Sequence, residues 1–469
     1  MISRRNLLGT VIGTAVGASL TPSLSLAQET SIEESTKLLK KSASKRLPWR
    51  NWSGSQTCFP EARLAPKTIE ELQQMISQAP AGIRPVGAGH SFSPLVPTDD
   101  TIISLSRMTG VVAHDEQLNQ ADILAGTRLG DIGKPLAERG QAMINMPDID
   151  EQTLAGALGT ATHGTGATLG CLSDFVEELE LVSANGERLS CSKEKHTEIF
   201  EAARVNLGAL GIISKIRLQN MPKYRLKRET SCLPIDEILD NAEQTANTHR
   251  NFEFYYIPFS GYGLMDTHDI TEEAPSTTDK LDQNDGAQTL KEVRDWLAWS
   301  PRIREYILSH EMKKIEKETT IANSWQNYAQ ERNVRFNEME YHLPREYAVQ
   351  AFREIRTLVE THFDQVFFPF EFRYVKSDDI WLSPFQGRET CSIAVHRFYN
   401  EDYHAMFKAV EPIFKKYHGR PHWGKLNTMT PKEFAAHYPN WRDFKEVRQT
   451  LDPHGKFLNP YLKQLFELA

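Results

Sequence analysis

Several absences narrow the possible functions of this 469-residue chain. Its five cysteines are scattered and form no C-x-x-C pair, so neither a metal site nor a disulfide framework is indicated. Acidic residues outnumber basic residues by 62 to 54, and the resulting net charge of −8 argues against a nucleic-acid partner. The sequence contains no internal repeat and no long low-complexity tract, and its length suffices for two domains with separate cores. The cysteines are Cys58, Cys171, Cys191, Cys232 and Cys391, and the sequence leaves open whether one pair forms in an oxidising compartment.

The first 27 residues are expected to form a twin-arginine signal peptide. Arg4 and Arg5 precede a mildly apolar stretch rich in Gly, Ala and Thr, and Ser25-Leu26-Ala27 offers a small-x-small cleavage site. We therefore expect residues 28–47 to be a linker and the folded protein to be periplasmic or secreted. An uncleaved anchor is the alternative, which a proline and several glycines in the short apolar stretch disfavour. No later stretch is apolar enough to cross a bilayer.

The most informative motif follows the short apolar run at residues 83–86. Gly87 and Gly89, spaced by one residue, permit positive φ and let the backbone approach a ligand closely. Successive N–H groups in such a loop attract phosphate oxygens, so His90 would lie at the lip of a phosphate site. The alternative is a tight glycine turn beside a surface histidine, because Phe92 occupies the third glycine position of the dinucleotide fingerprint.

Two further segments are also rich in small residues. Residues 154–166 contain four glycines, three threonines and no acidic, lysine or arginine residue. Small side chains let an elongated ligand lie against the backbone, and threonine hydroxyls offer compact hydrogen-bond donors. Residues 206–213 carry two more glycines and lead into the alternating pattern of a predicted strand at 214–218.

In this order and spacing, the three segments resemble the FAD-binding domain of the vanillyl-alcohol-oxidase (PCMH-type) flavoproteins. Within that group the chain is similar to the aldonolactone and alditol oxidases. The resemblance implies an α+β fold, with an FAD-binding PCMH-type domain at 48–222 and an α+β substrate (cap) domain at 223–420. It also implies that residues 421–469 return to the FAD domain, and that His90 forms a covalent bond with the flavin 8α-methyl group.

The resemblance further implies which residues contact the cofactor. They come from the three small-residue segments, from a stretch near residue 147 and from a late motif around residue 422. The set is Arg84, Val86, Gly87, Ala88, Gly89, His90, Ser91, Pro147, Asp148, Gly156, Gly159, Thr160, His163, Gly164, Thr165, Gly211, Ile212, Ile213, His422 and Lys425.

Glu371 and Arg373 are the first candidates for catalysis. The segment 370–375 has the composition of a strand, so residues two apart project from the same face, with the flanking aromatics on the other. Such a pair can be a surface salt bridge of little consequence. The resemblance instead places it over the reacting face of the flavin. Arg373 would bind the substrate hydroxyl and stabilise alkoxide character, and Glu371 would orient Arg373 and accept the hydroxyl proton.

Lys425 and His396 complete the predicted catalytic set. Lys425 ends the segment 420–425, which the resemblance places beside the isoalloxazine, where a positive charge stabilises the anionic reduced flavin. The alternative is a solvated lysine that follows a packed tryptophan. His396 matches a substrate-pocket histidine of the alditol oxidases, although a lone histidine on a strand is often a satisfied hydrogen-bond partner.

The resemblance also implies a reaction. We expect FAD-dependent oxidation of an alcohol carbon on an aldonolactone of the D-arabinono- or L-gulono-1,4-lactone type, with oxygen as acceptor and hydrogen peroxide as product. Pro147 favours oxygen use, whereas Asp148 replaces a serine that contacts polyol in alditol oxidase. Alternatives are an alditol oxidase, a dehydrogenase of the same fold that passes electrons to a quinone or cytochrome c, and a non-catalytic sugar-binding protein.

Periodicity predicts the elements outside these motifs. One helix is expected at 68–77, capped at its start by Thr68, and another at 129–139. A hairpin turn is expected at Asn185-Gly186. Residues 271–288 form a predicted acidic loop. Residues 291–318 show a helical pattern on which Trp296, Trp299 and Tyr306 are expected to belong to the core.

Overall fold

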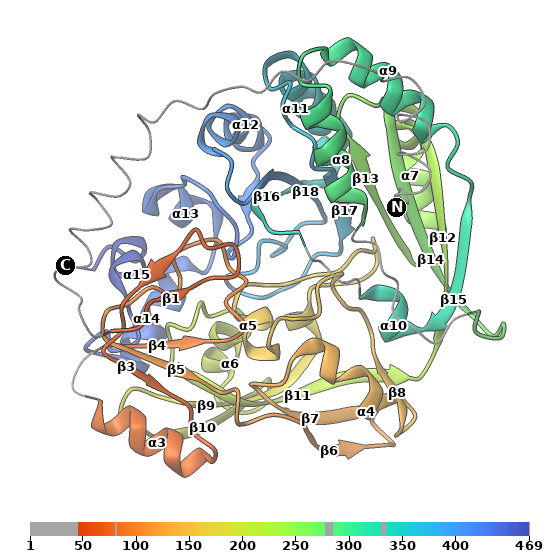
Figure 1. The fold of residues 1–469 in the computed structure, drawn as a ribbon. Helices are drawn as coiled ribbons and strands as arrows, with labels where there is room; N and C mark the ends of the chain where they lie inside the picture. The colour runs from red at the N-terminus through yellow and green to blue at the C-terminus, as the bar shows by residue number, and fades with distance from the viewer. Residues whose placement is uncertain (1–45, 80–81, 277–284, 330–333, 469) are drawn as a thin grey trace.

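The computed structural model describes residues 46–79, 82–276, 285–329 and 334–468 (Figure 1). The predicted signal peptide at 1–27 and nearly all of the predicted linker lie outside the described residues. The described chain forms an N-terminal part built on two main sheets, a second part built on one large sheet, and a C-terminal group of helices.

A small parallel sheet begins the N-terminal part. Its strand order is β3 (Ala62–Leu64), β5 (Thr101–Ser104) and β4 (Ile83–Val86), and a short hairpin of β1 (Trp49–Arg50) and β2 (Thr57–Cys58) precedes it. Helix α3 (Ile69–Gln78) connects β3 to β4. The Thr68 hydroxyl accepts a hydrogen bond from the Glu71 N–H and caps α3, as the sequence predicted. This sheet matters for the site because its strand β4 ends at the glycine loop.

A six-stranded antiparallel sheet completes this part. Its order is β10-β9-β11-β7-β6, and β8 pairs with the far end of β11. The strands are β6 (Val111–Asp115), β7 (Gln120–Leu124), β8 (Gln141–Met143), β9 (Val176–Val182), β10 (Arg188–Ser192) and β11 (Ile212–Pro222). Short helices α5 (Leu154–Gly159), η2 (Leu172–Phe175) and α6 (Thr197–Ala203) connect them. The predicted turn between β9 and β10 is confirmed, with Gly186 at a φ of 85°.

The predicted helix at 129–139 is wrong in its continuity. The segment divides into η1 (Leu129–Asp131) and the short helix α4 (Gly133–Ala137). Gly130 and Gly133 have low helix propensity, and Pro135 cannot donate a backbone hydrogen bond. Gly133 is the first residue of α4, and a Cβ there would lie 2.5 Å from the side chain of Trp325, so the packing requires glycine at this position.

The second part is an eight-stranded sheet with order β15-β12-β14-β13-β17-β18-β16-β19. Every pairing in it is antiparallel. The strands are β12 (Arg225–Pro234), β13 (Asn251–Ile257), β14 (Tyr262–Thr271), β15 (Glu318–Asn323), β16 (Phe336–Pro344), β17 (Phe370–Val375), β18 (Thr390–Phe398) and β19 (Arg420–Pro421). In Figure 1 this sheet, green to blue, lies above the orange and yellow strands of the N-terminal part.

Three helices cover one face of the large sheet. They are α7 (Ile235–Thr248), α11 (Ala348–His362) and α12 (His404–Lys416), with η3 (Arg345–Tyr347) before α11. Phe254 and Phe372 stack on this face with ring centroids 4.7 Å apart, and Phe352 of α11 packs edge-on against both. Because side chains alternate along a strand, Glu371 and Arg373 project from the opposite face. The predicted strand and its two faces are confirmed.

The expectation that Trp296, Trp299 and Tyr306 belong to the core is wrong. Their exposed fractions are 60%, 74% and 71%. The segment forms two helices, α8 (Asp285–Trp296) and α9 (Pro301–Met312), because Pro301 begins a new helix and breaks the continuous pattern. The buried apolar residues of this hairpin are instead aliphatic residues and a methionine, namely Leu290, Val293, Leu308 and Met312. Helix α8 also takes up residues 285–288, which were expected to belong to the acidic loop.

The C-terminal helices α13 (Pro431–His437), α14 (Trp441–Leu451) and α15 (Pro460–Leu465) return to the N-terminal part. The Ile83 N–H donates to the Lys456 carbonyl at 2.7 Å, and the Asn459 amide donates to the Pro94 carbonyl at 2.8 Å. Both contacts lie beside β4, so the end of the chain supports the glycine loop. The short helix α10 (Ser324–Tyr328) lies after β15, and all five cysteines are free. Among the described helices, none combines the length and apolar character of a membrane span.

Candidate active site

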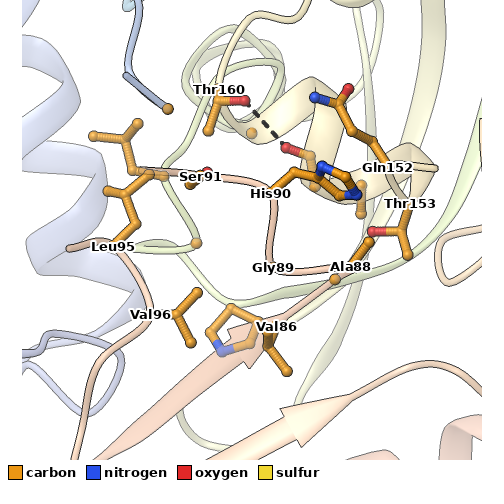
Figure 2. A pocket seen from close by; sticks show the side chains of 18 of the residues that line it. Val86, Ala88, Gly89, His90, Ser91, Leu95, Val96, Gln152, Thr153 and Thr160 are labelled. Carbon is orange, nitrogen blue, oxygen red and sulfur yellow. Dashed lines mark hydrogen bonds between the residues drawn. The ribbon is translucent and has the colours of Figure 1, made fainter. Parts of the chain in front are cut away.

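One cavity brings together the three small-residue segments found in the sequence. It is bordered by residues 84–93, 152–160 and 206–213, and at one end by Glu338 and Lys425. Figure 2 shows His90 projecting from its loop into the space bordered by Gln152, Thr153 and Thr160. Segments separated by more than 100 residues therefore form a single site.

The glycine loop after β4 is suited to phosphate oxygens. The backbone N–H groups of residues 88–91 donate to no acceptor among the described residues. Gly89 has a φ of 72°, which an L side chain rarely adopts. A Cβ at Gly87 would lie 2.2 Å from the Thr153 Oγ1, so glycine allows this loop to pack closely against the start of α5. The loop thus offers free donors at a place where the backbone can approach a ligand.

The His90 side chain is partly buried against an aromatic wall. Its ring stacks on Trp52 with centroids 5.4 Å apart, and Trp52 packs edge-on against Phe336. Burial, together with the charges of Lys425 and Arg128, lowers the pKa of His90 to about 4. The imidazole is therefore neutral at neutral pH, and a neutral ring nitrogen has the lone pair that a covalent bond to a flavin methyl carbon requires.

Arg84 connects the loops that form the cavity. Its guanidinium donates to the carbonyls of Leu95 at 2.8 Å, Leu207 at 2.7 Å and Gly208 at 2.8 Å, and also to the Phe457 carbonyl. Burial lowers the pKa of Arg84 to about 9. Although Arg84 borders the cavity, these donors are directed to protein carbonyls, so its side chain positions the walls.

The structure divides the predicted cofactor residues into two groups. Those that border the cavity are Arg84, Val86, Gly87, Ala88, Gly89, His90, Ser91, Gly156, Gly159, Thr160, Gly211, Ile212, Ile213, His422 and Lys425. Those placed outside its border are Pro147, Asp148, His163, Gly164 and Thr165. Asp148 and His163 instead contact charged side chains on the large sheet, as described next.

Arg373 lies among three carboxylates. Its Nε donates to Glu253 at 2.9 Å, and its NH2 group contacts Asp148 at 3.1 Å and Glu371 at still closer range. Glu253 faces Arg373 across the β13–β17 pairing. Burial raises the pKa of Glu253 to about 7; Arg373 opposes this shift, and Glu371 adds to it. The predicted Glu-x-Arg pair is therefore part of a buried cluster with excess negative charge.

Lys425 lies between two carboxylates of strand β16. Its ammonium group forms an ion pair with Glu338 and lies 3.6 Å from a Glu340 oxygen. Burial acts to lower the pKa of Lys425, but the two carboxylates outweigh burial and raise it. Burial likewise opposes ionisation of Glu338, yet Lys425 and His396 bring its pKa down to about 2. Both partners are therefore charged at neutral pH.

His396 and His163 are held by the same strand. The His396 Nδ1 lies 2.9 Å from the Pro369 carbonyl, and its Nε2 lies 3.5 Å from Glu338. The His163 Nε2 lies 3.0 Å from Glu340. Ligating atoms of Glu338, Glu371 and His396 all lie within 4.8 Å of one another. The predicted catalytic residues Glu371, Arg373, His396 and Lys425 are thus brought together, with Glu338 in their midst.

The sequence analysis missed Glu253, Glu338 and Glu340. The last two follow the same rule that identified Glu371 and Arg373, because acidic residues two apart on a strand share a face. The segment 336–344 carries that signal, with Glu338 and Glu340 separated by one residue. Glu253 offers no such local signal, since its role depends on the pairing of β13 with β17.

The chain matches two protein families along most of its length. Residues 216–465 match the family described as D-arabinono-1,4-lactone oxidase, and residues 60–192 match the FAD binding domain family. An L-gulono-1,4-lactone dehydrogenase of Mycobacterium tuberculosis is 34% identical over 428 residues, which cover 89% of this chain and 98% of the relative. The L-gulonolactone oxidase of Bos taurus is 31% identical over 440 residues, which cover 90% of this chain and 99% of the relative.

A solved structure agrees at the level of fold. The cholesterol oxidase of Brevibacterium sterolicum superposes with a TM-score of 0.76 over 90% of this chain and 97% of its own, at 15% sequence identity. The predicted two-part architecture, an FAD-binding PCMH-type domain with a substrate domain, is therefore confirmed. With its cavity, its glycine loop and its Glu-x-Arg strand, this chain belongs to the D-arabinono-1,4-lactone oxidase family of FAD-dependent oxidoreductases.

Proposed function

We propose that this enzyme oxidises an alcohol carbon of an aldonolactone, of the D-arabinono- or L-gulono-1,4-lactone type, and transfers the electrons to oxygen. The observation that carries the proposal is the convergence of Glu371, Arg373 and His396 beside Glu338 and Lys425, and these last two residues border the cavity. The names of the relatives support a sugar lactone as substrate. Hydroxyl-rich lactones are suited to a wall that offers many carboxylate acceptors.

The residues of the site would divide the chemistry between them. FAD, when bound, supplies the acceptor for the hydride from the alcohol carbon. Arg373 keeps its positive charge and would stabilise negative charge on the substrate oxygen. Glu371, held by Arg373, would accept the hydroxyl proton as that charge develops. Lys425 would place its ammonium group toward the cofactor end of the cavity, where the reduced flavin gains negative charge.

Purified enzyme and a panel of substrates test this function. Aldonolactones, the matching aldonates and alditols are mixed anaerobically with the enzyme while flavin absorbance is followed, and peroxide is measured in parallel aerobic samples. We expect lactones to bleach the flavin with the highest second-order rate constants. Preferential bleaching by alditols would favour the alditol oxidase alternative, to which a Streptomyces alditol oxidase with 26% identity over 430 residues lends support. If no compound bleached the flavin, the non-catalytic sugar-binding protein would be the alternative that remains.

The electron acceptor is tested separately. The two relatives cited above are a dehydrogenase and an oxidase, and Pro147 is the residue that favours oxygen in our proposal. Flavin reduced under nitrogen is mixed with buffer containing oxygen in a stopped-flow instrument. We expect reoxidation within seconds, whereas flavin that stays reduced for minutes would indicate a dehydrogenase feeding a quinone or cytochrome c.

We also propose that FAD is attached covalently through His90. The neutral imidazole of His90 in the glycine loop, stacked on Trp52, supports this bond. Acid-denatured protein should keep a fluorescent flavin band on a gel, and His90→Ala should lose it. Release of free flavin from the denatured wild-type protein would contradict the linkage.

The twin-arginine motif supports export of the folded holoenzyme to the periplasm or the exterior. The double variant Arg4→Lys/Arg5→Lys tests this route, because it removes the arginine pair and keeps the positive charge of the signal. We expect this variant to retain flavin and to accumulate in the cytoplasm. Equal export of the wild-type protein and the double variant would contradict the proposed route.

A further inference from the structure

Glu338 is a buried carboxylate on the border of the cofactor cavity that the sequence motifs did not identify. Its exposed fraction is 3%, and it lies on β16 opposite His396 of β18. It forms an ion pair with Lys425, which borders the same cavity. A carboxylate at this place works against the stabilisation that a lysine gives to an anionic reduced flavin.

The contacts of Glu338 and Glu340 differ in a way that decides which one offsets Lys425. Glu340 accepts from the Ser392 hydroxyl and lies 3.0 Å from the His163 Nε2, so several partners share its charge. Its distance to the ammonium group is 3.6 Å. Glu338 contacts the ammonium group more closely, and the His396 Nε2 lies 3.5 Å from its carboxylate. Glu338 is therefore the main counter-ion of Lys425.

We propose that Glu338 is a positioning residue that holds Lys425 toward the cofactor, offsets its charge and thereby keeps the reduction potential of the flavin low. This inference rests on the proposed seat of the flavin beside Lys425. A lysine without a counter-ion would stabilise the reduced anionic flavin strongly and make its reoxidation less favourable. With Glu338 ionised, the positive charge still orients the cofactor but stabilises the reduced form less.

Glu338 also connects the cofactor end of the site to the substrate end. Its carboxylate, the Glu371 carboxylate and the His396 ring converge within 4.8 Å. A substrate hydroxyl that donates to Glu338 would draw part of its charge away from Lys425. Occupation of the substrate site should therefore raise the flavin potential, which favours reduction when substrate is present and reoxidation after product leaves.

Glu338→Gln tests the offset, because it removes the charge and keeps the shape and the hydrogen-bonding capacity. The flavin potential is measured on the holoenzyme with redox dyes, and sulfite affinity is measured by flavin bleaching, both without substrate. We expect the potential to rise, sulfite to bind at least tenfold more tightly, and oxygen to reoxidise the flavin several-fold more slowly. Lys425→Met should shift the potential downward.

Two further variants separate this role from simple packing. Glu338→Asp keeps the charge and should retain a potential close to that of the wild type. Glu338→Met removes the charge at similar volume and gives a second measurement if the glutamine variant binds FAD weakly. An unchanged or lower potential in both neutral variants would overturn the inference. Failure to oxidise any lactone would instead overturn the proposed function, because the potential and the sulfite affinity need no substrate.

Discussion

The proposed site has two walls of different composition, which we call the cofactor wall and the substrate wall. The cofactor wall, at residues 87–91, 152–160 and 206–213, is rich in glycine, alanine and aliphatic side chains and contains no acidic, lysine or arginine residue, although Arg84 borders the same cavity. The substrate wall carries five buried or nearly buried carboxylates and two cations, namely Asp148, Glu253, Glu338, Glu340, Glu371, Arg373 and Lys425, of which Glu338 and Lys425 also border the cofactor cavity. Backbone donors suit a cofactor of fixed shape, whereas movable protons and charges need side chains.

The two walls are also stabilised in different ways. The cofactor wall depends on close packing of its loops, as between Gly87 and Thr153. The substrate wall depends on mutual compensation, because an isolated buried carboxylate is costly and a paired one is tolerated. We therefore expect the substrate wall to be sensitive to loss of a charge and the cofactor wall to gain of a methyl group.

Arg373→Ala should show the largest effect. It leaves Glu253, Glu371 and Asp148 without their shared cation, and breaking a buried ion pair costs about 3–5 kcal/mol. Loss of stabilisation at the reacting oxygen should lower kcat by about 10³ or more. Chemical denaturation and steady-state kinetics measure both effects. Arg373→Lys is the matched control: it keeps the charge but not the forked geometry, so stability should recover more than kcat.

Gly87→Ala should break the cofactor wall with a smaller effect. The added Cβ would lie 2.2 Å from the Thr153 Oγ1, and such overpacking costs about 1–3 kcal/mol. The bound flavin per protein and the melting temperature should both fall. The double variant Gly87→Ala/Thr153→Ala removes the clashing hydroxyl and should restore flavin content. If it does not, the close approach of the two loops is not the reason for glycine at this position.

The sequence predicted the cofactor wall more completely than the substrate wall. Glycine and threonine spacing is a local signal, so Gly89, His90 and Gly156 could be assigned to one site before the fold was known. Glu371 and Arg373 could also be paired from a local signal, because they lie two residues apart on one strand. In contrast, Glu253 reaches Arg373 through strand pairing across 120 residues, which no local pattern encodes.

A second limit concerns which face of a helix is buried. The periodicity of Trp296, Trp299 and Tyr306 suggested a core stripe, but all three are exposed. Pattern alone gives the spacing of apolar residues, and a break at Pro301 changes which of them point inward. Buried apolar positions such as Val293 and Leu308 were available on the same segment.

Glu253→Gln should change how stability depends on pH. Folding raises the pKa of Glu253 from 4.5 to about 7, so between these values the native protein binds more protons than the unfolded chain. The stabilisation is complete below pH 4.5 and is lost as the pH rises through about 7. Glu253→Gln should reduce this slope by about 1 kcal/mol per pH unit, measured by urea denaturation from pH 4.5 to 8.

A comparison with another acid sharpens this result. Burial also raises the pKa of Asp378 to about 7, and this carboxylate accepts hydrogen bonds from the Ser383 hydroxyl, the Ile380 N–H and the Cys171 thiol rather than from Arg373. Asp378→Asn should therefore flatten the stability profile in the same pH window. It should leave the pH dependence of kcat/KM unchanged, whereas Glu253→Gln should shift it. Equal kinetic effects of the two variants would argue against a special role for the carboxylates around Arg373.

Trp299→Ala should have the smallest effect, because the side chain lies outside both walls and is 74% exposed. Surface substitutions of this kind change the free energy of unfolding by about 0.5 kcal/mol or less. Trp423 is the buried counterpart: it is 1% exposed, donates to the Leu382 carbonyl at 2.6 Å and stacks on Phe434. Trp423→Ala should cost about 3–5 kcal/mol in the same denaturation experiment. A large loss of stability in Trp299→Ala would show that the α8–α9 hairpin is buried in solution against a surface that this chain alone does not supply.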